Sequence, residues 1–269
     1  MEPFELFAVK YGHHGPRSPL ANAIRGDLHD EATTDLDMYV WVAKRSDRAF
    51  LIDTGMNARA AEQRQRTRLR APDEAIGLLG LDAAQVEDVI ITHLHYDHAG
   101  TLDRYAAARF HVQDREVAFA TGRCMCRRYL RGLYDVEDVV ALVRLLHAER
   151  VTFHDPVEEI VPGLTVHRIG GHSAGIQAVR VWTKRGWVVL ASDAVHFFAL
   201  IRHGLVFPTL YRADEVLEGY QTILKLAEGD LDRIVPGHDP MVMQMYRSPS
   251  PELEGIVVRL DEPPVEHLQ

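Results

Sequence analysis

Residues 90–100 read Ile-Ile-Thr-His-Leu-His-Tyr-Asp-His-Ala-Gly, an apolar run that breaks into three histidines and an aspartate. We interpret this stretch as a buried strand that runs into a loop and then a helix. In extended chain, His93 and His95 point to the same side because side chains alternate with a period of two. Asp97 and His98 follow on the turn. The stretch therefore predicts several polar side chains gathered at one strand end.

These residue types suit a metal ion. Neutral imidazoles and a carboxylate are ligands for Zn²⁺ and similar divalent ions. The carboxyl ends of strands in layered α/β folds are also where ligands are usually held. A polar loop with histidines by chance is the plain alternative. Four potential ligands in this order argue against it.

Three later strand ends add further candidates. Gly170 and Gly171 precede His172, and glycines permit backbone angles that turn a histidine inward. Asp193 and His238 each follow an apolar strand. Any one of these three would more often be structural, but together with the first cluster they predict a metal centre. Seven ligands suit two metals with an open solvent position, namely His93, His95, Asp97, His98, His172, Asp193 and His238.

The remaining pattern predicts two strand-rich halves separated by a helical insert, and hence two sheets stacked face to face with helices outside. Strands are expected at 4–11, 36–43, 49–52, 89–91, 109–112, 151–153, 164–169, 178–183, 187–191 and 233–235. Helices are expected at 72–79, 115–120, 136–150 and 216–227. Everything after Tyr246 resembles a tail.

We expect a single domain over residues 1–269, with two irregular parts. A turn-rich N-terminal loop is predicted at about 12–35, where His13 and His14 suit the rim or outer surroundings of a site better than its centre. A helical insert is predicted at about 113–150. The insert is expected either to recognise substrate or cover the cleft, or to be a solvated helical segment docked by its apolar face.

Charge and composition limit the function. The chain has 269 residues, 46% of them hydrophobic, and 39 acidic residues against 30 basic ones give a formal charge of −9. Nucleic acids and anionic membranes need a positive surface, so we expect neither as a partner and instead a small-molecule substrate. The sequence does not decide between a monomer and a homodimer.

The cysteines and the N-terminus bear on location. Cys124 and Cys126 are too few for a disulfide framework and lack the Cys-x-x-Cys spacing, so ordinary reduced thiols are expected. The N-terminus has no basic region followed by an apolar core, and no apolar run approaches the roughly 18 residues of a membrane span. We expect a cytoplasmic protein.

The motif set resembles that of the metallo-β-lactamase superfamily. His93-x-His95-x-Asp97-His98 matches its first motif, and a later histidine, aspartate and histidine follow in the family's order, from about Leu36 to His238. The resemblance implies an αββα sandwich of two mixed β-sheets flanked by helices. It also implies how the ligands divide: His93, His95 and His172 on one metal, Asp97, His98 and His238 on the other, with Asp193 bridging.

The implied chemistry is hydrolysis with two divalent metal ions. Zinc is expected first, although such sites also take iron, cobalt or manganese. A hydroxide bridging the metals attacks a polarised carbonyl, since metals lower the pKa of bound water. Asp97 both ligates a metal and orients or receives a proton. Asp53, at the end of an expected strand, is either an outer partner of a ligand or a loop cap.

Within the superfamily the chain looks most like the N-acyl-homoserine lactonase branch. The resemblance rests on residues 93–100, overall length, the N-terminal extension and the insert. Lactonases usually place a tyrosine three residues after the bridging aspartate, whereas this chain has His196, which is expected to donate a hydrogen bond or act as an acid. Four nearby apolar residues are expected either to line the substrate site or to pack in the core, namely Phe197, Phe198, Leu200 and Phe207.

Other functions of this fold are kept as alternatives. One is hydrolysis of a thioester, an amide or another cyclic ester. Another is a mononuclear iron oxygenase such as a persulfide dioxygenase. A non-catalytic binding protein on the same scaffold has no reason to keep all seven ligands. The leading prediction is a lactonase that opens a small lactone such as an N-acyl-homoserine lactone, a quorum-quenching activity.

Overall fold

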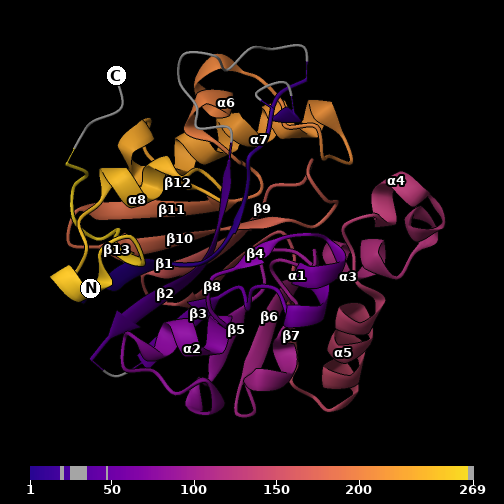
Figure 1. Cartoon of the computed structure of the whole chain (residues 1–269), viewed down its shortest axis with the longest axis horizontal. Coiled ribbons are helices and arrows are strands. Elements are labelled where there is room, and N and C mark those ends of the chain that lie inside the picture. Colours follow the sequence, from indigo (N-terminus) through magenta and orange to yellow (C-terminus); the bar gives the residue numbers. More distant parts are fainter. Residues whose placement is uncertain (19–20, 25–34, 47, 266–269) are drawn as a thin grey trace.

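The computed structural model describes residues 1–18, 21–24, 35–46 and 48–265. Two mixed β-sheets pack face to face, and helices cover both outer faces (Figure 1). Within the described residues, no helix combines the length and the apolar character that crossing a bilayer would need. The predicted αββα sandwich of two mixed sheets is confirmed.

The first sheet has eight strands, in the order β13-β1-β2-β3-β5-β6-β7, with β4 paired to β1. The strand bounds are β1 Glu5–His14, β2 Leu36–Arg45, β3 Arg48–Ile52, β4 Thr67–Arg68, β5 Asp88–Ile90, β6 Arg109–Gln113, β7 Val151–His154 and β13 Val257–Arg259. Strands β3, β5, β6 and β7 run parallel, so their carboxyl ends meet at one edge.

The second sheet has five strands, in the order β12-β11-β10-β9-β8. Their bounds are β8 Val157–Val161, β9 Leu164–Arg168, β10 Gln177–Thr183, β11 Gly186–Ser192 and β12 Ile234–Pro236. Only β11 and β12 are parallel neighbours. Their carboxyl ends therefore deliver the residues after Ser192 and Pro236 to the same edge.

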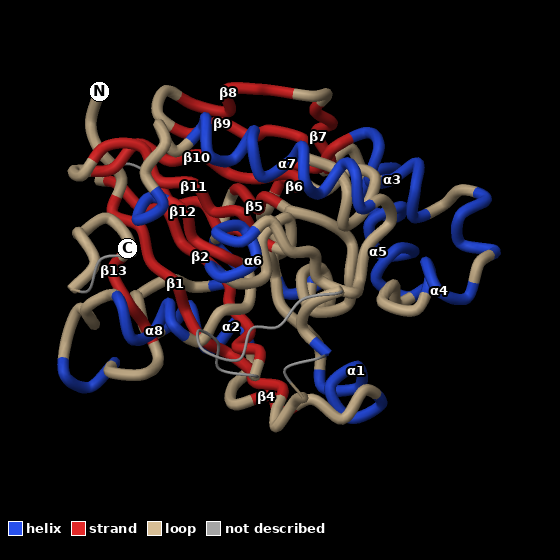
Figure 2. The backbone as a smooth tube through the Cα atoms, turned by 90° about the horizontal axis from the view of Figure 1, so that it is seen from above, coloured by secondary structure: helices blue, strands red, loops and turns tan. Residues whose placement is uncertain are grey.

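Helices fill the outer layers. Their bounds are α1 Ala58–Gln63, α2 Pro72–Gly77, α3 Asp114–Ala120, α4 Arg128–Arg131, α5 Val136–His147, α6 Phe198–His203, α7 Ala213–Leu226 and α8 Met241–Met245. Short 3₁₀ turns occupy Ala83–Gln85, Leu102–Arg104, Arg123–Cys126, Leu231–Arg233 and Pro251–Leu253. Helix α7 lies over the second sheet, and α4 stands away from both sheets (Figures 1 and 2).

Alternating side chains build three apolar layers. Trp41 on β2 and Leu190 on β11 point between the sheets and share one buried cluster. Val40 and Val42, on either side of Trp41, join the cluster under α1 and α5 on the opposite face. The outer face of the second sheet packs against α6 and α7 in a third cluster. Because both faces of both sheets are covered, the central strands are apolar throughout rather than alternating with polar residues.

Three expectations differ from the structure. The segment after Tyr246 is not a tail, because Val257–Arg259 pairs with β1 and closes the first sheet. The expected boundary between the sheets is also displaced, since Val151–His154 pairs with β6 in the first sheet. Residues 12–14, assigned to the N-terminal loop, belong to β1 because they pair with β2. Much of that loop (19–20 and 25–34) lies outside the described residues.

The expected insert at about 113–150 contains α3, α4 and α5. Helix α5 begins at an N-cap, where the side chain of Asp135 accepts a hydrogen bond from the backbone N–H of Glu137. Its apolar side packs on the first sheet through the buried Leu142. The assignment of residues 1–269 to a single domain stays a prediction, as does the role of the insert in substrate recognition.

Candidate metal centre

Four strand ends bring all seven predicted ligands to one edge of the sandwich. The first four follow β5, His172 follows β9, Asp193 follows β11, and His238 follows β12. All seven side chains are buried. Gly170 and Gly171 precede His172 with φ values of +80° and +87°, so the turn needs the left-handed backbone that the sequence suggested.

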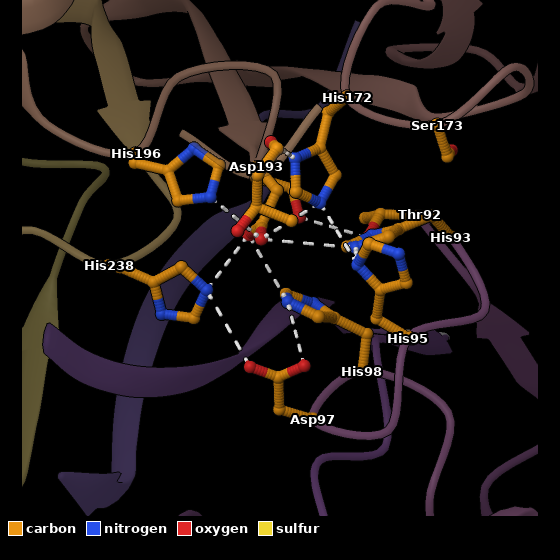
Figure 3. Close-up of polar contacts among 12 residues, drawn as sticks. Thr92, His93, His95, Asp97, His98, His172, Ser173, Asp193, His196 and His238 are labelled. Carbon is orange, nitrogen blue, oxygen red and sulfur yellow. Dashed lines mark hydrogen bonds and ion pairs between the residues drawn. The ribbon is translucent and has the colours of Figure 1, made fainter. Parts of the chain in front are cut away.

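The first cluster contains His93, His95, His172 and Asp193 (Figure 3). His95 Nδ1 lies 2.9 Å from His93 Nε2 and 3.0 Å from His172 Nε2. His172 Nε2 lies 3.3 Å from Asp193 Oδ2. Nitrogens on a tetrahedral zinc ion are about 3.3 Å apart at ordinary bond lengths. Three converging imidazoles and a carboxylate therefore fit one metal ion.

The second cluster contains Asp97, His98 and His238. Asp193 joins it through its other oxygen, because Oδ1 lies 2.9 Å from His238 Nε2 and 3.2 Å from His98 Nε2. Asp193 Oδ1 and His98 Nε2 are buried and make no hydrogen bond within the described residues. Buried polar atoms rarely lack a partner, and a bound ion is one explanation. The two oxygens of Asp193 thus face different clusters, as a bridging carboxylate requires.

Acceptor groups hold the outward nitrogens of the histidines. A ligating histidine normally donates its second ring N–H to such a group, which fixes the ring and its tautomer. The four pairs are His93 Nδ1 with Thr92 Oγ1 at 3.1 Å, His98 Nδ1 with Asp53 Oδ2 at 2.7 Å, His172 Nδ1 with the Thr209 carbonyl at 2.9 Å, and His238 Nδ1 with the Asp37 carbonyl at 2.8 Å. Each of the four rings therefore turns Nε2 inward.

Burial keeps the imidazoles of the first cluster neutral. It lowers the pKa of His93 and of His95 well below the ordinary value, and that of His172 to about 3. A histidine must be unprotonated to ligate a metal. These three rings are therefore in the ligating form at neutral pH, as the fit to a metal requires.

Asp53 fills both roles considered for it. The residue is fully buried at the end of β3 with φ at +61°. Its Oδ2 lies 2.7 Å from His98 Nδ1, and its Oδ1 accepts the Thr92 N–H at 2.7 Å. The carboxylate thus orients a predicted ligand and also caps the loop after β5.

Replacing Asp53 by asparagine is expected to weaken metal binding at the second cluster by about 10–100-fold. The amide carries no charge and offers one acceptor oxygen in place of two, so it cannot hold His98 and Thr92 as the carboxylate does. Competitive titration with a chromogenic chelator measures this affinity. Asp103→Asn, at an exposed aspartate, is the control. Unchanged affinity in Asp53→Asn would contradict the orienting role.

Glu116 was not predicted from sequence. Its fully buried carboxylate accepts four hydrogen bonds, from the Leu94 N–H at 2.9 Å, the Gly175 N–H at 3.1 Å, Ser173 Oγ at 2.5 Å and Tyr134 Oη at 2.9 Å. It therefore ties the loop of His93 and His95 to the loop of His172. An acidic residue in the first turn of a short helix looks like an ordinary solvated residue, and only the distant loops reveal its role.

His196 lies beside the bridging position. Its Nε2 is 3.2 Å from Asp193 Oδ2, and its ring stacks on Phe207 with centroids 3.8 Å apart. Of the four apolar residues considered as a substrate wall, Phe197, Phe198 and Leu200 pack in the cores. Phe207, by contrast, also lines a small cavity beside the second cluster.

A small cavity of about 80 Å³ opens onto the second cluster. Its lining includes Asp97, Asp193, His196 and His238 together with Arg17 and Arg66. A larger hollow of about 510 Å³ beside α1 and α5 contains none of the seven predicted ligands. Of these two hollows, the smaller one therefore adjoins the predicted ligands.

Other candidates lie outside the two clusters. His13 Nδ1 is 2.9 Å from Asp37 Oδ1, and His14 Nδ1 is 3.2 Å from Arg66 Nη1. Both histidines therefore belong to the surroundings of the site, as expected. Cys124 and Cys126 are free cysteines, also as expected.

The fold and the two clusters define a metallohydrolase-like protein of the αββα class. The sequence profile described as the Metallo-beta-lactamase superfamily matches residues 34–238. The chain therefore belongs to the metallo-β-lactamase superfamily.

Individual relatives are more distant. The chain is 29% identical over 165 residues to the N-acyl homoserine lactonase AttM of Azorhizobium caulinodans, covering 60% of this chain and 61% of that protein. It is 27% identical over 179 residues to the N-acyl homoserine lactonase AiiB of Agrobacterium fabrum, covering 60% and 64%. The matches thus span about three fifths of these relatives. A crystal structure of a quorum-quenching N-acyl homoserine lactone lactonase is similar with a TM-score of 0.72 and 20% identity, over 89% of this chain and 93% of that one.

Proposed function

We propose that this protein is a dinuclear metal-dependent hydrolase that opens a small lactone or a similar cyclic ester. The observation that carries the proposal is the position of Asp193, whose two oxygens face two separate clusters of buried ligands. A cavity beside these clusters admits the reacting group. We infer zinc as the first choice of metal, because histidine and carboxylate ligands suit it.

The residues divide by what they do. His93, His95 and His172 would hold one ion, Asp97, His98 and His238 the other, and Asp193 both. When bound, two divalent ions lower the pKa of water and polarise a carbonyl oxygen. The two carboxylate oxygens of Asp97 lie 4.0 Å from His98 Nε2 and 3.9 Å from His238 Nε2. Asp97 could therefore be a ligand of the second ion and also orient or receive a proton at the cavity.

The lactone is proposed from the relatives, both of which are named N-acyl homoserine lactonases. An N-acyl-homoserine lactone is therefore the first substrate class to test. The second cluster, which includes three buried candidate ligands, favours a dinuclear hydrolase over a mononuclear iron oxygenase.

The test is a pH-stat titration with metal analysis of the same sample. The panel contains N-acyl-homoserine lactones, simple lactones, linear esters, thioesters and β-lactams. We expect acid release from lactones and about two metal ions per chain. Acid release from thioesters alone would contradict the lactonase, and oxygen consumption with persulfides by an iron-loaded sample would support the alternative oxygenase.

His196→Ala is expected to lower kcat about 10²-fold while the metal content stays unchanged. The imidazole lines the cavity proposed for the reacting carbonyl, where a proton donor would contribute about 10²–10⁴-fold. His196→Tyr restores the residue type usual in lactonases and is expected to recover part of the rate. Steady-state kinetics and metal analysis of both variants measure the effect. Full activity in His196→Ala would show that the ring only packs on Phe207.

A further inference from the structure

Two arginines lie at the same cavity as the metal clusters. Arg17 follows β1 and Arg66 precedes β4, and both are half-buried. Both line the 80 Å³ cavity together with Asp193 and His196. Two positive charges therefore face the space in which the substrate reacts.

Within the described residues, the hydrogen bonds of the Arg17 guanidinium go to neutral acceptors, and the group lies 5.8 Å from the centroid of the Phe207 ring. Arg17 Nε donates to Asn22 Oδ1 at 3.0 Å and its Nη2 donates to the Ala21 carbonyl at 2.9 Å. Asp35 accepts the main-chain N–H of Arg17 at 3.2 Å, and in the described part of the chain it forms no ion pair with the guanidinium. Burial, followed by the charge of Arg66, lowers the pKa of Arg17, and the charges of Tyr96 and Asp35 act in the opposite direction.

Arg66 is held in the same way. Its Nε donates to Tyr96 Oη at 3.1 Å, and its Nη1 donates to the Arg64 carbonyl at 2.7 Å and to His14 Nδ1 at 3.2 Å. Burial, together with the charges of Arg66 and Arg17, lowers the pKa of His14 to about 4. His14 is therefore a neutral acceptor at pH 7 and adds no charge to the pair.

Several other arginines of this acidic chain have carboxylate partners. Arg48 pairs with Asp88 at 2.6 Å, and Arg59 pairs with Asp135 at 2.7 Å. Among the described residues, Arg17 and Arg66 form no such pair, although acidic residues outnumber basic ones. A guanidinium that lines a cavity and has no carboxylate partner can bind an anionic group of a ligand.

Each guanidinium also keeps a free terminal nitrogen. None of the hydrogen bonds within the described residues uses Arg17 Nη1 or Arg66 Nη2. The neutral acceptors fix the other nitrogens and so orient both groups. Planar guanidinium groups bind carboxylates by two parallel hydrogen bonds, and this geometry makes arginine selective for them.

We propose that the substrate carries a carboxylate beside its lactone or ester group, and that Arg17 and Arg66 bind this carboxylate. An N-acyl-homoserine lactone has no such carboxylate, so the inference favours an anionic lactone over that class. The inference rests on the proposed hydrolase function. In the reaction, the ring C–O bond breaks and water supplies a hydroxyl to the carbonyl carbon and a hydrogen to the leaving oxygen. The product is a hydroxy acid with two carboxylates, and one proton is released at neutral pH.

Measurements of ligand binding test the inference separately from catalysis. The probes are 5-oxopyrrolidine-2-carboxylate and its carboxamide, lactams of similar size in which a neutral amide replaces the charged carboxylate. Calorimetry with the metal-loaded full chain is expected to give at least about tenfold tighter binding of the carboxylate, since hydrogen bonds to charged groups are the strong ones. Arg17→Met and Arg66→Met should lose most of this difference. Arg109→Met, an exposed arginine at the amino end of β6, should keep it.

Turnover separates this inference from the proposed function. The matched substrates are 5-oxotetrahydrofuran-2-carboxylate and its carboxamide, and the carboxylate is expected to have at least about tenfold higher kcat/KM. Equal values, or a preference unchanged in both arginine variants, would overturn the inference while the lactonase stands. Selective lactam binding without hydrolysis of either lactone would overturn the lactonase instead, and would support the carboxylate site.

Discussion

Asp193→Ala is expected to lower kcat/KM for any substrate of this site by about 10³-fold or more. Asp193 presents one carboxylate oxygen to each cluster, with Oδ2 3.3 Å from His172 Nε2 and Oδ1 2.9 Å from His238 Nε2. Its removal takes a ligand from both proposed metal positions. Charge stabilisation by metal ions is worth several kcal/mol of barrier, and about 1.4 kcal/mol corresponds to tenfold in rate.

Metal content is the second measurement on Asp193→Ala. The wild type is expected to retain about two ions per chain after dialysis, and the variant one or none. Glu218→Ala removes an exposed carboxylate from α7 and serves as the control with unchanged metal and activity. His95→Ala, which affects the first cluster alone, is expected to lose activity as well. Two tightly held ions in Asp193→Ala would contradict the bridging role.

The positions of the predicted ligands could be inferred from sequence because one local rule applies to each of them. A short apolar strand followed by a glycine-bounded or polar turn places its next side chains at a sheet edge. His172 and His238 satisfy this rule although they are 66 residues apart and individually unremarkable. Their convergence depends on the second sheet, where β9 is antiparallel to β10, β10 antiparallel to β11 and β11 parallel to β12, so that β9 and β12 end at the same edge. The resemblance to the family supplied the sandwich and the division of the ligands, but not these pairings.

Long-range contacts set the limit of sequence reasoning. Val257–Arg259 lies in a β-branched run that favours a strand, but local sequence does not reveal that its partner is β1, at the other end of the chain. Arg17 and Arg66 are similar, because the sequence shows two ordinary arginines and only the fold places them at one cavity. Pairing partners, and the charges that a site leaves unpaired, are properties of the folded chain.

Glu116→Ala is expected to lower the free energy of unfolding by about 3–5 kcal/mol, since breaking a fully buried polar network leaves its donors without partners. Four donors lose their acceptor, including the backbone N–H groups of Leu94 and Gly175. Because these two groups belong to the loops of His95 and His172, the variant is also expected to bind metal more weakly. Denaturation in urea with an unchanged m value measures the loss of stability.

The controls for Glu116→Ala separate the network from the helix. Asp114→Ala removes an exposed acidic residue from the same first turn of α3 and is expected to cost less than about 1 kcal/mol. Glu116→Gln keeps the shape and one acceptor oxygen but turns an amide N–H₂ toward donors, so its stability should lie between those of the wild type and Glu116→Ala. If Glu116→Ala unfolds at the urea concentration of the wild type, the carboxylate does not hold the two loops together. If Glu116→Ala is destabilised but binds metal as tightly as the wild type, the two loops keep their positions without the carboxylate.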